Sequence, residues 1–297
     1  GMDVVSTAAG MYEVINVNMA SGVREVTVKK GHDPREFPLV VAGGAGPVHA
    51  CGIALELEIP VMIIPKESSI FCAAGMLLSD LKHDFVRTYP VLIEAVNWDR
   101  LRSLFTEMER EGTELLRYEN ISEERIGYLY SLDMRYVKQY HEVNVVVERS
   151  EIEKADVRSI AGKFHPEHDR LYGYSLADEG TPIELINLRL TCIGTTRKPE
   201  FKPEEYCGED ASRSLKGRRE VYLRKRRDFE EVDIYDGLGL GYGNAIEGPA
   251  IVEQVHTSIF ISPEYKLLCD RYGSYTLYLK EEEGEVRGRI IEHPKSR

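Results

Sequence analysis

The most constraining feature of this chain is the run PLVVAGGAGPVHACGIALELEIPVMIIP at residues 38–65. Its two apolar segments, residues 39–42 and Val61–Ile64, show no polar alternation, which is typical of strands buried on both faces of a parallel or mixed sheet. Between them lie a glycine-rich turn and a stretch with helical spacing, residues 48–57. The run predicts a β-turn-α-β unit inside an α/β domain.

The segment before this unit predicts a long helix over residues 3–30. Its apolar residues recur at helical spacing, namely Val4, Ala8, Met11, Ile15, Met19, Val23 and Val26. Gly31 follows the last turn, where a left-handed residue is favoured, and Pro34 prevents continuation. Residues 68–81 predict a further helix after the β-turn-α-β unit.

After His83 the pattern changes to a mixture of helices and strands. An amphipathic helix is predicted at Trp98–Tyr118, with a buried stripe of Leu101, Leu104, Phe105, Met108, Leu115 and Leu116. Strands are predicted at residues 125–134, 142–148 and 183–193, with a helix at 152–165. From about Pro199 short strands alternate with glycine-rich turns, which is typical of a small β barrel or sandwich. We therefore expect an α/β module (1–82), an α+β module (83–196) and a β-rich module (197–297).

Charge and composition exclude several classes of function. A net charge of −12 argues against nucleic-acid binding, which depends on clustered Lys and Arg, and no partner of that kind is expected. The basic run at residues 216–227 is followed by Asp228, Glu230 and Glu231, which favours a solvated hairpin over an anion-binding patch. No segment approaches the roughly 18 apolar residues of a membrane span. Five scattered cysteines without a CxxC pattern indicate reduced thiols and a cytoplasmic protein.

The glycine-rich turn is the first candidate site. Gly43, Gly44, Ala45, Gly46 and Pro47 lie between a predicted buried strand and a helix, where backbone N–H groups and the helix dipole can contact a nucleotide. The alternative is a tight turn that binds nothing. A Rossmann fingerprint would need Gly or Ala where His49 stands, and the end of a Walker A loop is absent.

The same turn resembles the adenosine-side turn in the second lobe of the actin/Hsp70/sugar-kinase ATPases. More specifically, nearly the whole chain resembles the hydantoinase A, N-methylhydantoinase and 5-oxoprolinase family, to which the acetone carboxylase beta subunit is related. The matching landmarks appear in family order: Asn18-Met19, residues 31–37, Gly43 to Pro47 with His49-Ala50, residues 74–80, Asp133 to Tyr136 with Gln139, Tyr172-Gly173-Tyr174, Asn187-Leu188-Arg189 and residues 248–251. In two departures, Lys138 stands where the family usually has Gly, and residues 66–69 replace a Pro/Gly-rich loop.

This resemblance implies the C-terminal part of an ATP-dependent enzyme that opens a cyclic amide or imide, or carboxylates a ketone, through a phosphorylated intermediate. Residues 1–82 would be the remainder of an ATPase second lobe, contacting ATP through residues 43–47 and His49. The family's Asp-x-Gly-Gly-Thr phosphate loop is missing from the sequence. Mg²⁺ or another divalent metal would therefore be bound mainly by a missing N-terminal lobe, and no metal site is expected in this chain.

The partners implied by the resemblance are that missing lobe, a hydantoinase B-like subunit, a small-molecule substrate and, in some assemblies, further copies of the chain. Removal of one lobe predicts an apolar face near the glycine-rich turn. The alternative function is a non-catalytic interaction or regulatory subunit that keeps the shape of the lobe.

Asp133, Arg135, Gln139 and His141 are the candidate catalytic residues. If the predicted strand continues unbroken, alternation places all four on one face, where they could grip a lactam or imide and position a water molecule. The alternative is a solvated strand face held by ordinary ion pairs. His165 and His168 could share a helix face, but Pro166 is expected to break that helix, so no metal site is predicted there.

Overall fold

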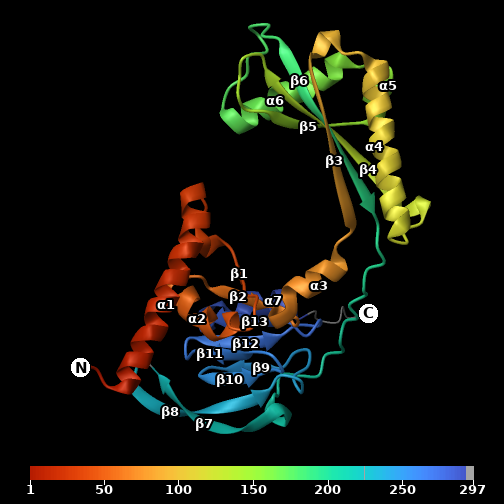
Figure 1. Ribbon diagram of the computed structural model, residues 1–297. Helices are drawn as coiled ribbons and strands as arrows, with labels where there is room; N and C mark the ends of the chain where they lie inside the picture. The colour runs from red at the N-terminus through yellow and green to blue at the C-terminus, as the bar shows by residue number, and fades with distance from the viewer. Residues whose placement is uncertain (224, 292–297) are drawn as a thin grey trace. The chain divides into compact units, whose positions relative to one another are not determined.

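The structure is a computed structural model that describes residues 1–223 and 225–291 (Figure 1). The chain divides into two compact units: unit 1 comprises Gly1–Leu77 and Glu200–Arg297, and unit 2 comprises Leu78–Pro199. Each unit contains its own sheets and hydrophobic core. The mixed α/β character predicted from the sequence is confirmed, whereas the first and third predicted modules form one unit.

The predicted β-turn-α-β run is present at the start of unit 1. Strand β1 (Leu39–Val40) leads into helix α2 (Gly46–Leu57) and then strand β2 (Val61–Ile64). The two strands are parallel, with Leu39 opposite Met62. The preceding helix α1 (Val4–Thr27) is followed by a short 3-10 turn that ends at Gly31, whose φ of 82° is the predicted left-handed conformation.

C-terminal strands complete the sheet that this run begins. Its order is β1-β2-β13-β12-β9, with β9 at Ala245–Glu247, β12 at Tyr265–Cys269 and β13 at Tyr275–Leu279. Strand β13 pairs antiparallel with β2, so Thr276 lies opposite Ile63. This pairing joins the first and third predicted modules, because apolar residues of both bury one common core. Helix α7 (Glu283–Ile290) follows β13.

The second sheet of unit 1 has the order β11-β10-β8-β7. Its strands are β7 (Leu215–Leu223), β8 (Asp228–Asp236), β10 (Ala250–Glu253) and β11 (Ser258–Ile261). Strands β7 and β8 form the hairpin predicted for the basic run, although residue 224 lies outside the described residues. The sequence predicted a separate small barrel or sandwich for the C-terminal strands. They are instead divided between these two sheets, one of which also contains β1 and β2.

Unit 2 is a four-stranded antiparallel sheet with helices packed on one face. The strand order is β3-β6-β4-β5, with β3 at Leu81–Leu92, β4 at Ile126–Tyr136, β5 at Val143–Val147 and β6 at Ile183–Gly194. Helices α4 (Trp98–Tyr118), α5 (Arg149–Lys154) and α6 (Val157–Tyr172) share one core with these strands. The α+β prediction for this region is therefore confirmed.

Two predictions at the level of single elements need correction: the helix expected at residues 68–81 is present but ends at Leu78, and the break expected at Pro166 was wrong. The helix expected at residues 68–81 comprises a 3-10 turn (Ser68–Ile70) and α3 (Phe71–Leu78), and the long strand β3 follows at once. Pro166 lies inside α6 and does not break it. Phe164 and His168, both buried, hold the helix against the core on either side of Pro166, and this packing outweighs the lost backbone hydrogen bond. No helix in the described part of the chain has both the length and the apolar character needed to cross a membrane.

Candidate functional site

The glycine-rich turn is held by contacts from two distant segments of unit 1. Gly43 has a φ of 93° and donates its N–H to the carbonyl oxygen of Ser68 over 2.7 Å. The carbonyl oxygen of Gly44 accepts a 2.7 Å hydrogen bond from Thr257 Oγ1, in the loop between β10 and β11. A Cβ added to Gly44 would lie 3.3 Å from the carbonyl oxygen of His256. The turn is therefore fixed in place, and Gly43 is the residue whose backbone requires glycine.

The start of α2 leaves backbone donors free beside this turn. Ala45 is the N-cap residue and makes no side-chain cap, and Pro47 occupies the first turn. In the described part of the chain, the N–H groups of Gly44 and Ala45 have no acceptor, and residues 42–45 are exposed. Unpaired N–H groups and the positive end of the helix dipole favour a negatively charged or strongly polar ligand here.

Ser68 is an unsatisfied polar group behind the turn. Its side chain is fully buried, and Oγ has no hydrogen-bond partner among the described residues. Because a buried hydroxyl without a partner costs about 1–3 kcal/mol, such a group is common where a ligand or water completes the site. The glycine-rich turn and Ser68 thus fit the edge of a binding site better than a closed structural turn.

His49, which the sequence grouped with the turn, faces helix α1 instead. Its Nδ1 lies 2.8 Å from Asn16 Oδ1, and its ring stacks on Tyr12 with 5.1 Å between the centroids. The Tyr12 hydroxyl donates to the carbonyl oxygen of Val48. Helices α1 and α2 are closely packed at Asn16: a Cβ added to Gly52 would lie only 2.3 Å from Asn16 Nδ2. The structure therefore places His49 in the α1–α2 interface.

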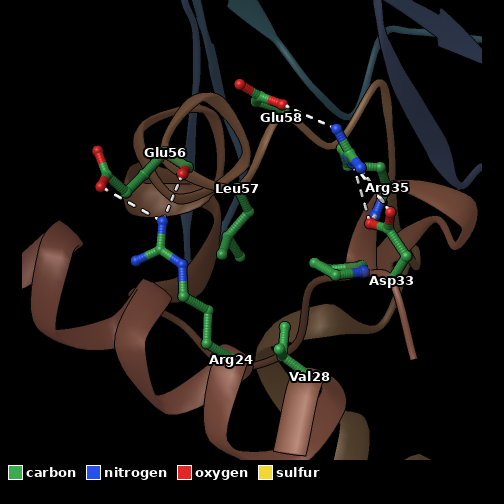
Figure 2. A pocket seen from close by; sticks show the side chains of 8 residues that line it. Arg24, Val28, Asp33, Arg35, Glu56, Leu57 and Glu58 are labelled. Carbon is green, nitrogen blue, oxygen red and sulfur yellow. Dashed lines mark hydrogen bonds and ion pairs between the residues drawn. The ribbon is translucent and has the colours of Figure 1, made fainter. Parts of the chain in front are cut away.

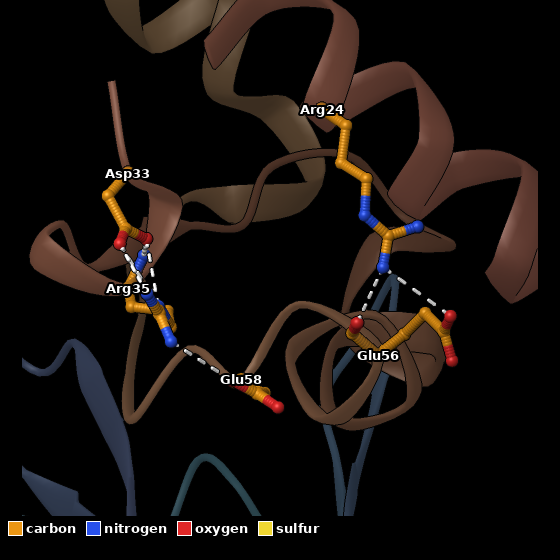
Figure 3. Close-up of polar contacts among 5 residues, drawn as sticks. All are labelled: Arg24, Asp33, Arg35, Glu56 and Glu58. Carbon is orange, nitrogen blue, oxygen red and sulfur yellow. Dashed lines mark hydrogen bonds and ion pairs between the residues drawn. The ribbon is translucent and has the colours of Figure 1, made fainter. Parts of the chain in front are cut away.

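A small charged pocket lies where α1 and α2 end (Figure 2). Its volume is about 220 Å³, and Asp33, Pro34 and Arg35 of the family landmark at residues 31–37 line it. Arg35 holds Asp33 through two guanidinium nitrogens and also reaches Glu58, while Arg24 contacts Glu56 (Figure 3). The hydrogen bonds from Arg35 lower the pKa of Asp33 to about 2. Since each arginine already has an acidic partner, this landmark ties the loop to α2 and is not an open anion site.

In unit 2, Asp133 is the centre of a polar cluster on the sheet. The neighbouring residues Leu132 and Met134 face the core, so alternation places Asp133 on the opposite face. It is only 3% exposed and accepts hydrogen bonds from Asn144 Nδ2 (2.8 Å), Asn187 Nδ2 (3.0 Å) and Arg189 Nε (2.6 Å). Two of the family landmarks, around Asp133 and at residues 187–189, therefore meet in one cluster.

The other three candidate catalytic residues do not join this cluster. Strand β4 ends at Tyr136, and Lys138 turns the chain with a φ of 72°. Arg135 pairs with Glu184 across the sheet at 2.8 Å. Beyond the strand, Gln139 and His141 both contact side chains in or just after α6. Gln139 forms hydrogen bonds with His168 and Tyr174, and His141 stacks on Tyr172. The four residues therefore do not share one face of a strand. The prediction that they would do so required an unbroken strand from 133 to 141, and β4 ends at Tyr136.

Sequence reasoning missed several residues that build these sites. Thr257 supports the glycine-rich turn, Asn16 binds His49, and Asn144 binds Asp133. Thr257 lies 213 residues from its partner, so no local pattern could have indicated it. Within the described residues, no group of three or more His, Cys, Asp or Glu side chains could hold a metal ion.

Comparison with known proteins gives two family matches that together span most of the chain. Residues 1–85 match the model for hydantoinase/oxoprolinase, and residues 93–280 match the hydantoinase/oxoprolinase C-terminal domain. Caprolactamase subunit alpha of Pseudomonas jessenii is 31% identical over 93% of this chain and 40% of its own length. The chain thus spans about two fifths of this relative.

Two solved structures share the fold. Nucleotide-free acetone carboxylase, from work on ATP-dependent acetone carboxylation, superposes with a TM-score of 0.81 at 20% identity, covering 94% of this chain and 40% of that one. The ATP-dependent caprolactamase of Pseudomonas jessenii superposes with a TM-score of 0.65 at 29% identity, covering 94% and 41%.

Proposed function

This chain belongs to the hydantoinase/oxoprolinase family, and we propose that it is the C-terminal part of an ATP-dependent enzyme that opens a cyclic amide or imide. Among the relatives described above, caprolactamase has the reaction that agrees best with this proposal, the opening of a lactam. Carboxylation of a ketone, as in acetone carboxylase, is the variant that the same chemistry would allow. The complete enzyme would combine this chain with the remaining three fifths of the family polypeptide and a hydantoinase B-like subunit.

The observation that carries the proposal is the exposed turn at the start of α2. Gly43, Gly44, Ala45, Gly46 and Pro47 would hold the nucleotide, because free N–H groups and the absence of side chains permit close approach. On this proposal residues 1–77 retain part of an actin-like ATPase lobe, and the hydroxyl of Ser68 gains a partner when the nucleotide binds. A divalent metal would be held mainly by the remaining three fifths.

Phosphoryl transfer explains why an ATPase would open a lactam. The carbonyl oxygen of an amide attacks the γ-phosphorus of ATP, ADP leaves, and the amide becomes an O-phosphorylated imidate. Water then adds to the imidate carbon and the C–N bond breaks, with the proton going to the leaving nitrogen, which gives the free amine and an acyl phosphate. A second water cleaves the acyl phosphate, giving the carboxylate of the amino acid and inorganic phosphate. Transfer converts a poor leaving oxygen into phosphate, and the contribution of the protein is positioning and charge stabilisation.

Contact of the substrate with the sheet of unit 2 stays a prediction. The Asp133 cluster offers a guanidinium and two amides beside a carboxylate, which suits a polar imide or lactam. Arg135, Gln139 and His141 would act from separate positions around it, and their part in catalysis is likewise a prediction.

One variant of the turn and one glycine control outside it test the proposal. The sample is this chain mixed with the three fifths of Pseudomonas jessenii caprolactamase subunit alpha that lie outside the match, and ADP affinity and melting temperature are measured together. Gly44→Val should weaken ADP binding at least tenfold, because its side chain stands beside the free N–H groups. Gly31→Ala, outside the turn, is the control: Gly31 has a φ of 82° and an added Cβ meets nothing within 4 Å, so the variant should cost about 1–2 kcal/mol through backbone strain and leave the affinity of the folded protein intact.

Turnover separates the two functions considered for this chain. Caprolactam, 5-oxoproline or acetone with bicarbonate should stimulate ATP hydrolysis by the mixture but not by the isolated chain. A well-folded Gly44→Val with unchanged affinity would remove the turn from the mechanism. If the two parts form a complex that no substrate stimulates, the chain is a non-catalytic interaction subunit.

A further inference from the structure

Helix α1 has the composition of a helix that is surrounded by protein. From Val4 to Val23 its one charged residue is Glu13, and apolar residues occur on every side of the helix. A helix that is apolar all round is normally buried, whereas a surface helix carries charges on its outer face. Helix α4 of unit 2 is the comparison, because its buried stripe is balanced by a charged outer face.

The structure covers only one side of α1. Its buried residues are Asn16 and Ala20, which lie on the side packed against α2. The apolar stripe predicted from the sequence faces solvent: Val4 is 85% exposed, Met11 is 69% exposed and Val26 is 61% exposed. Figure 1 shows α1 along one side of unit 1. An exposed apolar face therefore runs along this helix, and its extension to the glycine-rich turn stays a prediction.

A groove beneath the N-terminal half of α1 continues this surface. Its volume is about 1150 Å³, and its walls come from α1, α2 and strands β7, β8, β10 and β11. Apolar side chains such as Val5, Val221 and Phe260 line it, and Phe229 on β8 is 48% exposed. At the rim, Lys225 pairs with Glu264 at 2.6 Å and Arg226 pairs with Glu230 at 2.7 Å. Arg219 and Glu13 also line the groove, so a mainly apolar lining carries single charges of both signs.

We propose that α1 and this groove, together the α1 surface, dock an apolar segment from the remaining three fifths of the family polypeptide. The inference rests on the proposed function, in which those three fifths complete the enzyme. The length of the relatives supports this occupant, because the chain spans only 40% of caprolactamase subunit alpha. Contiguous apolar surface of this kind is the usual mark of a protein–protein interface. An apolar rather than a charged segment fits, because the exposed part of α1 offers almost no charge.

Binding measurements with single substitutions test the α1 surface. The probe is again the part of Pseudomonas jessenii caprolactamase subunit alpha outside the match, and complex formation with the full chain is followed by light scattering and calorimetry. Met11→Glu on the helix and Phe229→Glu on the groove wall should each weaken binding at least tenfold. Tyr118→Glu, at an 88% exposed position at the end of α4, is the matched control and should change binding less than threefold. Circular dichroism melts check that all three variants fold.

Several outcomes would overturn the proposal. Failure of the wild-type chain to bind the probe is one, and equal binding by Met11→Glu and Phe229→Glu is another. A dimer of the chain alone that Met11→Glu dissociates would assign the surface to a second copy. The proposed function fails separately: a complex that is sensitive to both substitutions but shows no substrate-stimulated ATP hydrolysis would keep the docking surface and reject the enzyme.

Discussion

Lys138 turns the chain away from β4 with a φ of 72°, in the left-handed region that is unfavourable for a residue with a side chain. The resemblance to the family described from the sequence implies a glycine at this position. The conformation is imposed from both sides, since Arg135 on the strand pairs with Glu184, and Gln139 after the turn contacts His168 and Tyr174. Contacts on both sides of Lys138 therefore hold it in a conformation that favours glycine.

Lys138→Gly should relieve this strain and raise the free energy of unfolding by about 0.5–1 kcal/mol. Urea denaturation of the two proteins measures the difference. Asn120→Gly is the control, because Asn120 has a φ of 64° but asparagine tolerates this region, so its gain should be within a few tenths of a kcal/mol. Equal effects at the two positions would show that Lys138 is not strained.

The sequence predicted the bounds of an element closely where the apolar periodicity of its own residues extends over the whole element. It did so less well where residues distant in the sequence determine the bounds. The bounds of α4 and β2 agree with the periodicity of their own residues. Leu115 was assigned to the buried stripe of α4 but is exposed, since Gly112 provides the close contact with the sheet instead. Strand β3 was missed although its residues alternate, because its inward positions include polar residues such as Arg87, which pairs with Glu111. The end of β4 depends on the turn at Lys138, which apolar periodicity does not indicate.

Two helical glycines of unit 2 should respond to alanine with opposite signs. At Gly112 in α4, a Cβ would lie 2.2 Å from Cys192 Sγ, so Gly112→Ala should destabilise the protein by about 1–3 kcal/mol through overpacking. At Gly162 in α6, a Cβ meets nothing within 4 Å, so Gly162→Ala should stabilise it by about 0.5–1 kcal/mol through helix propensity. Chemical denaturation of both variants measures the signs, and a loss of stability at Gly162 would contradict the packing described for α6.

For the whole molecule, connectivity was the property least accessible from the sequence. Strand β2 of residues 1–77 pairs with β13 near the C-terminal end, for example Ile63 with Thr276. Nothing in the sequence of either strand indicates which strand it pairs with. The same holds for the candidate sites. The glycine-rich turn could be located from its letters, but its support by Thr257 and the separation of Asp133 from Gln139 follow from tertiary structure. Unit 2 is the exception, because all of its pairings lie within one continuous segment.

Unit 2 should therefore fold when it is excised as residues 78–199. Its core is formed by its own residues, and its two ends leave the sheet side by side, with Leu81 opposite Gly194. A fragment of this size buries enough surface to fold alone, so circular dichroism should show one cooperative melt. Residues 83–196, the boundaries expected from the sequence, are the control: they lack Asp80, which binds the N–H of Thr196 and Lys198 Nζ, and should melt several degrees lower. A fragment 78–199 without a cooperative transition would show that the core of unit 2 depends on the rest of the chain.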